Sequence, residues 1–192
     1  MAEISRADRA EDAALLAGLG LGDPEVAAAF VRRFQRAVYG LAASITRDAR
    51  AAEDVAQEVF LRAWRAADTY DVRRASVLTW LLTITRNAAI DAVRARRVSP
   101  TDDEVLAQLL RETLGDGPDP QETVAHRLES EEAIARLRAV SPEQARAVVL
   151  AVLGGCTAAE VARLEGVPLG TAKTRIRSGL LRLRELTEVD HG

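Results

Sequence analysis

A cation-rich segment near the C-terminus carries the clearest chemistry in this sequence. Between Pro168 and Arg184 there is no acid, but there are five cations: Lys173, Arg175, Arg177, Arg182 and Arg184. Two helices joined by a turn are predicted from about residue 157 onward. Thr157 and Glu160 have the spacing of a capping box, which marks the start of the first helix. Gly166 is suited to the turn, and Pro168 is suited to the first turn of the second helix. A helix-turn-helix with a cationic second helix is suited to bind DNA phosphates and base edges.

The charges of the chain are strongly segregated, which its net charge of −3 conceals. Residues 168–184 carry +5, and residues 70–97 carry six arginines against two acids. Residues 98–127 instead carry seven acids against two arginines. Two basic segments separated by an acidic one predict two nucleic-acid contacts, although either basic segment alone could equally be a solvated surface.

Composition excludes several classes of protein. Cys156 is the single cysteine, so the chain can form no internal disulfide. No cluster of cysteines and histidines has the spacing of a zinc site, and therefore no metal or cofactor is expected. His126 and His191 have no convincing catalytic partners, and no serine or cysteine has a nucleophile context, so the chain is not expected to be an enzyme. With no apolar run of membrane-spanning length and no signal peptide at the N-terminus, a cytoplasmic protein without membrane insertion is expected.

Apolar residues recur at helical spacings of three and four along nearly the whole chain, which predicts an all-α fold. Two such stripes are Phe30, Phe34, Val38, Leu41 and Ile45, and then Ala52, Val55, Val59 and Ala63. Helix starts are expected at Asp23-Pro24, Asp48, Ser76, Ser141-Pro142 and Thr157. Residues 98–121 interrupt the pattern with prolines, glycines and acids, which is typical of a linker. We therefore predict two small helical domains, 1–97 and 122–192, joined by a flexible acidic linker at 98–121, with the helix-turn-helix in the second.

Three segments in this order resemble an extracytoplasmic-function (ECF) sigma factor, the minimal class of bacterial RNA polymerase specificity subunit. The first, AAEDVAQEVFLRAW, covers residues 51–64 and looks like the family's polymerase-binding helix. The second, SVLTWLLTITRNAAIDAVRARR, covers residues 76–97 and looks like its −10-element helix. The third, SPEQARAVVLAVLGGCTAAEVARLEGVPLGTAKTRIR, covers residues 141–177 and looks like its −35-reading domain.

The resemblance implies a role for each segment. The first helix would dock on a coiled coil of core RNA polymerase through Asp54, Gln57, Glu58 and Phe60. The second segment would hold unpaired bases and backbone of melted promoter DNA through Tyr70, Arg73, Arg74, Trp80, Arg86, Asn87 and Arg94. The recognition helix would read duplex DNA through Leu169, Gly170, Thr171, Lys173, Thr174, Arg175 and Arg177. Core RNA polymerase and promoter DNA are thus the expected partners, and an anti-sigma factor is expected from the family.

For some of these residues a purely structural role fits the sequence as well as a binding role. Phe60 and Trp64 could simply fill the core, Trp80 is more typical of a core residue than of a base-stacking platform, and Asn87 could make a helix-packing hydrogen bond. The sequence also departs from the family pattern, which usually has an arginine where Ala145 stands, a larger aliphatic residue at Ala172 and a basic pair at Ser178-Gly179. These departures bear on how the −35 element is read.

Two other functions fit part of the sequence. The last sixty residues alone would suit a helix-turn-helix regulator that binds DNA without being a polymerase subunit. A helical interaction protein without DNA contacts is also conceivable, but the acid-free stretch at 168–184 argues against it. Co-purification with core polymerase separates a sigma factor from both.

Overall fold

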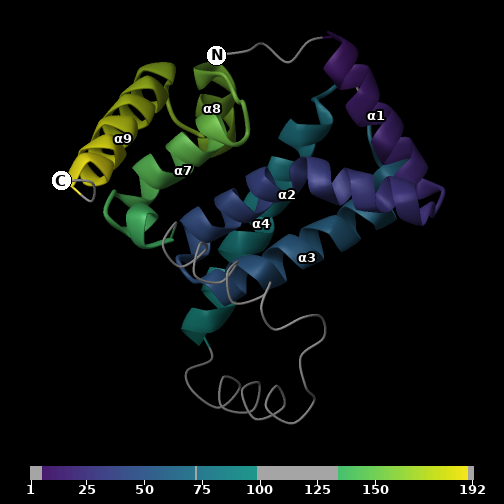
Figure 1. Cartoon of the computed structure of the whole chain (residues 1–192), viewed down its shortest axis with the longest axis horizontal. Helices are drawn as coiled ribbons and strands as arrows, with labels where there is room; N and C mark the ends of the chain where they lie inside the picture. Colours follow the sequence, from purple (N-terminus) through teal and green to yellow (C-terminus); the bar gives the residue numbers. More distant parts are fainter. Residues whose placement is uncertain (1–5, 72, 99–133, 190–192) are drawn as a thin grey trace.

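The computed structural model describes residues 6–71, 73–98 and 134–189, and all regular structure in these ranges is helical (Figure 1). This confirms the predicted all-α class. The helices are α1 (Arg6–Gly20), α2 (Pro24–Thr46), α3 (Ala49–Ala66), a 3₁₀ turn (Ala67–Thr69), α4 (Val77–Val98), α7 (Pro142–Val152), α8 (Ala158–Glu165) and α9 (Leu169–Val189). Apart from Val98, which ends α4, the predicted linker lies outside the described residues.

The predicted helix starts are fixed by local hydrogen bonds. The Asp23 carboxylate accepts from the Glu25 and Val26 backbone N–H groups at 2.9 and 3.3 Å. Asp48 and Ser76 accept in the same way from Ala51 and Thr79 at 2.8 and 3.2 Å. Such caps satisfy amides that the helix itself leaves unpaired. Full capping boxes open α7 and α8, and Gly166 ends α8 in the left-handed conformation at φ 65°.

Helices α1 to α4, hereafter the N-terminal block, surround one apolar core. The predicted stripe on α2 is buried, with Phe30, Phe34 and Val38 at most 3% exposed. It packs against the predicted stripe on α3 and against α4 and α1. The sequence analysis did not predict α1, whose Leu16 and Leu19 complete this core.

The C-terminal block, residues 134–189, packs α7 and α8 against α9. Val161 and Ala172 lie fully buried between these helices, and Cys156 lies beside them. At Gly179 α9 passes close to α7, since a Cβ atom there would lie 2.6 Å from Val148 Cγ2. Burial raises the pKa of the Cys156 thiol to about 12, so this thiol is neutral and unreactive at neutral pH.

The two blocks also pack directly against each other, chiefly through α2 and α7 (Figure 1). Ala37 and Leu41 of α2 and Leu82 of α4 are buried in the same cluster as Leu150 and Val149 of α7. The sequence analysis predicted only a tether between the blocks, because periodicity within each helix does not reveal which helices meet.

Candidate protein and nucleic-acid interfaces

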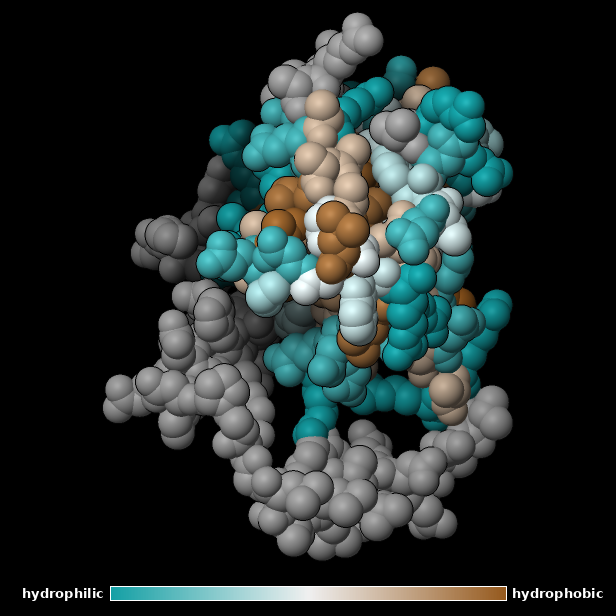
Figure 2. All heavy atoms as spheres, turned by 90° about the vertical axis from the view of Figure 1, so that its right-hand side faces the viewer, coloured by the Kyte–Doolittle hydropathy of each residue, from teal (hydrophilic) through white to brown (hydrophobic). Residues whose placement is uncertain are grey.

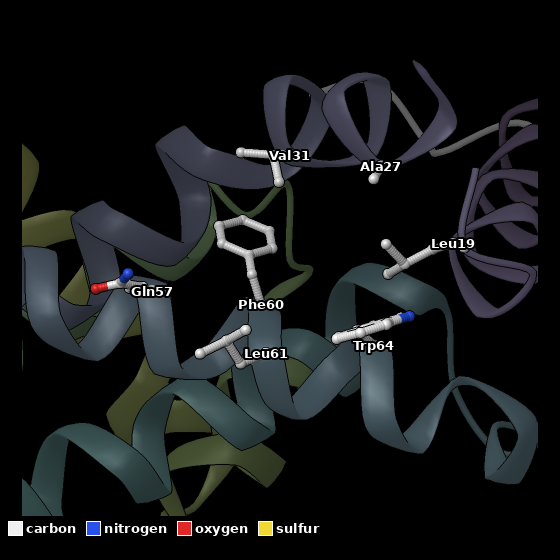
Figure 3. Close-up of a pocket in the computed structure, with 8 residues that line it drawn as sticks. Leu19, Ala27, Val31, Gln57, Phe60, Leu61 and Trp64 are labelled. Atoms are coloured by element: carbon white, nitrogen blue, oxygen red, sulfur yellow. The ribbon is translucent and has the colours of Figure 1, made fainter. Parts of the chain in front are cut away.

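An apolar groove lies at the junction of α1, α2 and α3. We call it the α3 groove; it is a hollow of about 490 Å³ lined by Leu19, Gly22, Ala27, Val31, Gln57, Phe60, Leu61 and Trp64. Figure 3 shows Phe60, Leu61 and Trp64 on α3 together with Val31, Ala27 and Leu19 from the other two helices. On this side of the molecule hydrophobic side chains gather in the middle of a hydrophilic surround (Figure 2).

The four residues predicted to bind polymerase lie along α3 at or beside this groove. Asp54 and Gln57 are exposed, and Gln57 lines the groove. The Glu58 carboxylate accepts from Arg62 Nε at 2.7 Å. Phe60 is half-buried and meets Phe30 edge-on at 6.2 Å, so it serves both the core and the groove wall. We call Asp54, Gln57 and Glu58 the polar row. A row of polar side chains beside an apolar hollow is typical of a protein-binding surface.

The structure adds Leu61 to this surface, which the sequence analysis did not assign to it, and it exposes Trp64, for which a core position was an equal alternative. Trp64 is 50% exposed and Leu61 is 39% exposed, although both are large and apolar. Leu21, in the turn between α1 and α2, is 88% exposed. Gln57, Leu61 and Trp64 follow one another at spacings of four and three, which place them on one helix face. That spacing was the signal that could have identified the groove wall.

The loop before α4 is held in place by its aromatic residue. The Tyr70 hydroxyl donates to the Ala75 carbonyl at 2.8 Å, and its ring lies 5.4 Å from that of Trp80. Both rings are half-buried against the N-terminal core. Burial is the main cause that raises the pKa of Tyr70. In this conformation Tyr70 and Trp80 pack against each other and anchor the loop to the N-terminal block.

The two arginines of the loop differ in their surroundings. Arg73 makes a two-pronged ion pair with Asp71, with Nε and Nη2 each 3.0 Å from a carboxylate oxygen. The side-chain and backbone hydrogen bonds from Arg73 lower the pKa of Asp71. Arg74 is exposed on the same loop. Cations on an exposed loop can track a nucleic-acid backbone.

Along α4 the predicted contact residues divide into free and engaged side chains. Asn87 is exposed, and Arg94 is exposed with only a 3.9 Å ion pair to Asp91. Arg86 instead points to the C-terminal block, where its Nε lies 3.4 Å from Glu165 Oε1 of α8. The structure therefore brings Asn87 and Arg94 to the surface but holds Arg86 between the two blocks.

The recognition helix α9 has one packed face and one open face. Ala172 and Gly179 are buried, with Ile176 packed beside them. Exposed on the other face are Leu169, Gly170, Lys173, Thr174 and Arg177, while Thr171 and Arg175 are half-buried. An added Cβ at Gly170 would meet no atom within 4 Å, so the start of the helix is open to close approach. Such an open, cationic helix start suits a major groove.

The departures from the family pattern now have structural reasons. Ala145 and Ala172 are fully buried, where a larger side chain would need space. Gly179 is required for the close passage of α9 over α7. Arg146, which could have replaced an arginine at position 145 in contacting DNA, donates instead to Glu165 at 2.8 Å.

The described residues hold neither a metal-binding cluster nor a membrane-spanning helix. In that part of the chain, no three or more His, Cys, Asp or Glu side chains are grouped so that they could hold a metal ion. Among its helices, none combines the length and the apolar character needed to cross a membrane.

Comparison with known families agrees with this geometry. Residues 30–98 match the family described as Sigma-70 region 2, and residues 130–183 match Sigma-70, region 4. The fold and these two regions define a sigma-70-type transcription initiation factor. The chain is 37% identical to the ECF RNA polymerase sigma factor RpoE of Cereibacter sphaeroides, over 94% of this chain and 97% of the relative. It is 32% identical to the ECF RNA polymerase sigma factor SigK of Mycobacterium ulcerans, over 89% and 90%.

Solved structures share the same fold. CnrH, in complex with the cytosolic domain of CnrY, superposes with a TM-score of 0.59 at 24% identity, over 93% of this chain and 98% of CnrH. The sigma factor RpoE, in complex with the anti-sigma factor NepR from Bartonella quintana, gives 0.58 at 24% identity, over 83% and 95%. The chain belongs to the ECF sigma factors of the sigma-70 family, and its function is that of an alternative sigma factor.

Proposed function

We propose that the N-terminal block binds core RNA polymerase through the α3 groove and the polar row beside it. Asp54, Gln57 and Glu58 supply hydrogen-bonding groups, and Phe60 and Trp64 supply apolar anchors. The observation that supports this assignment best is the exposure of Trp64 and Leu61 beside exposed Asp54 and Gln57. Large apolar side chains that are left half exposed next to hydrogen-bonding groups are typical of interfaces.

The two basic surfaces bind different elements of the promoter. The open face of α9 enters the major groove of the −35 element, with Lys173, Arg175 and Arg177 as its cations. The loop at 70–76 and α4 hold the melted −10 element through Arg73, Arg74, Arg86, Asn87 and Arg94. Tyr70 and Trp80 position this loop, since their mutual contact and the Tyr70 hydrogen bond to Ala75 fix its shape.

The chain works as a polymerase subunit rather than as an enzyme, and it acts in the cytoplasm, where bacterial polymerase meets DNA. An anti-sigma factor is a further partner that we propose. It is supported by the two structural neighbours, one of which is named as a complex with an anti-sigma factor and the other as a complex with the cytosolic domain of CnrY.

Capture of core polymerase by the tagged chain tests the first contact. Asp54→Ala and Gln57→Ala should each weaken binding by about 1–3 kcal/mol if they are interface hot spots. Both side chains are exposed, so circular dichroism should be unchanged. Arg50→Ala, an exposed position on the same helix without a proposed role, serves as the control. Unaltered affinity of both variants would remove this helix from the interface.

A further inference from the structure

The two acids of the basic segment at 70–97 both lie against arginines that are proposed to hold the −10 element. We call the loop and helix that carry these arginines the −10 surface. The segment contains six arginines and only two acids, Asp71 and Asp91. Asp71 forms an ion pair with Arg73, and Asp91 forms one with Arg94. Both acids of the segment therefore stand where they offset a cation that would otherwise face DNA.

Asp71 holds Arg73 through both of its carboxylate oxygens. Oδ1 accepts from Nε and Oδ2 accepts from Nη2 of Arg73, each at 3.0 Å. Oδ1 also accepts from the Arg73 backbone N–H at 3.0 Å, so the local turn and the ion pair support each other. A two-pronged contact with a carboxylate is also the geometry in which arginine binds a phosphate. Asp71 thus occupies the donors that Arg73 would offer to a DNA strand.

The second pair is looser. The distance from Arg94 Nη1 to Asp91 Oδ1 is 3.9 Å, and the two side chains are 77% and 66% exposed. The Arg73 side chain is 86% exposed, whereas that of Asp71 is 29% exposed. Ion pairs this close to water are weak, so neither acid locks its arginine permanently. A phosphate can therefore replace either carboxylate.

A DNA strand gains less from a paired arginine than from a free one. The arginine exchanges one charge-assisted contact for another, and the displaced carboxylate is left beside an anionic strand. The exchange also lowers the salt dependence of binding, because the displaced carboxylate takes up a cation while the phosphate releases one. Arg73 and Arg94 therefore add little affinity for a phosphate backbone as such.

We propose that Asp71 and Asp91 are positioning residues that hold Arg73 and Arg94 for the melted strand and keep the affinity of the −10 surface for phosphate low. Base contacts rather than charge then decide which strand occupies the surface, since phosphate contacts carry no sequence information. The chain without polymerase is accordingly not drawn onto bulk single-stranded nucleic acid. The competition for the two arginines rests on the ion pairs alone, whereas its role at the −10 element rests on the proposed function.

Asp71→Asn tests the proposal, because asparagine keeps an oxygen that can accept from the Arg73 backbone but loses the charge. Fluorescence anisotropy of the full chain with labelled oligothymidine should show up to about fivefold tighter binding for this variant. The plot of log affinity against log salt should be steeper by about 0.7. Asp91→Asn should change both quantities in the same direction but by less, because its pair is looser. Asp68→Asn, at an exposed position in the neighbouring 3₁₀ turn, is the control and should leave the salt slope unchanged.

A double-mutant cycle separates competition for Arg73 from simple repulsion of DNA by Asp71. In an Arg73→Ala background, Asp71→Asn should no longer steepen the salt slope. Equal affinities and slopes for wild type and Asp71→Asn would overturn the proposal. The same gain with and without Arg73 would also overturn it, because Asp71 would then act by its charge alone.

Promoter opening tests the proposed function separately. With core polymerase, Arg73→Ala and Arg94→Ala should each lower the permanganate reactivity of unpaired −10 thymines. Wild-type reactivity in both variants would overturn the assignment of these arginines to the −10 element, and with it the role of the acids there. The oligothymidine titrations would still decide whether the acids compete with phosphate for the arginines.

Discussion

Replacement of Trp64 by alanine is the sharpest test of the α3 groove. Trp64 is 50% exposed and forms part of the groove wall in the free protein. A tryptophan can bury up to about 250 Å², so a partner covering the exposed half would remove about 125 Å² of largely apolar surface from water. At about 25 cal/mol per Å² this gives a ceiling of about 3 kcal/mol, or about 100-fold in Kd.

The fold should tolerate the same change. Trp64 lies outside the buried core clusters, so truncation should lower the free energy of unfolding by less than about 2 kcal/mol, well below the loss for a fully buried tryptophan. The effect on polymerase binding should therefore exceed the effect on stability.

The assay is a fluorescence titration of core polymerase with labelled wild type and Trp64→Ala, beside thermal unfolding of each. Leu181→Ala is the control, because Leu181 is 54% exposed on α9, in the other block. We expect Trp64→Ala to bind about tenfold to 100-fold more weakly and the control to bind normally. Equal Kd values for folded Trp64→Ala and wild type would refute the assignment of the groove to polymerase.

Three further predictions address the DNA contacts and stability. Arg175→Ala should relax preference at one or two upstream base pairs by about 1–3 kcal/mol in selections from randomised duplexes, whereas uniform weakening across sequences would place Arg175 on phosphate. Asn87→Ala should preserve duplex binding but lower permanganate reactivity of unpaired −10 thymines, and wild-type reactivity would contradict its role. Burial alone would raise the pKa of Asp48, but hydrogen bonds from Ala51 and Arg96 lower it below its usual value. The stability that the Asp48 carboxylate contributes is therefore complete above its unfolded pKa of about 3.9, and it is lost as pH falls through its lower folded pKa. Asp48→Asn should make the melting temperature depend less on pH in the acid range, and an unchanged pH dependence would contradict this prediction.

Local chemistry made the helices predictable. Asp23, Asp48 and Ser141 cap the helices that they were expected to open, because a capping side chain acts within three residues of its own position. The apolar stripe from Phe30 to Leu41 is buried as expected, because its spacing of three and four matches the helical repeat. The helix-turn-helix followed from Thr157, Gly166 and Pro168 for the same local reasons.

The contacts between distant segments were not predictable in this way. No pattern in the sequence indicated that α7 passes against Gly40, or that Glu165 lies buried between Arg86 and Arg146. Tyr70, which was predicted to hold an unpaired base, also donates its hydroxyl to Ala75 and packs its ring against Trp80, and nothing in the loop sequence indicated these contacts. Pairings of this kind depend on how whole helices meet, which the period of a single helix does not encode.

Run-off transcription on a library of genomic fragments with purified core polymerase tests the central claim most directly. The chain should cause core polymerase to start at a small set of sites that share an upstream and a −10 sequence, and Lys173→Ala with Arg175→Ala should abolish initiation at sites that depend on the upstream sequence. Specific binding to duplex DNA without polymerase, together with no run-off product on any fragment, would contradict the account and favour a helix-turn-helix regulator instead.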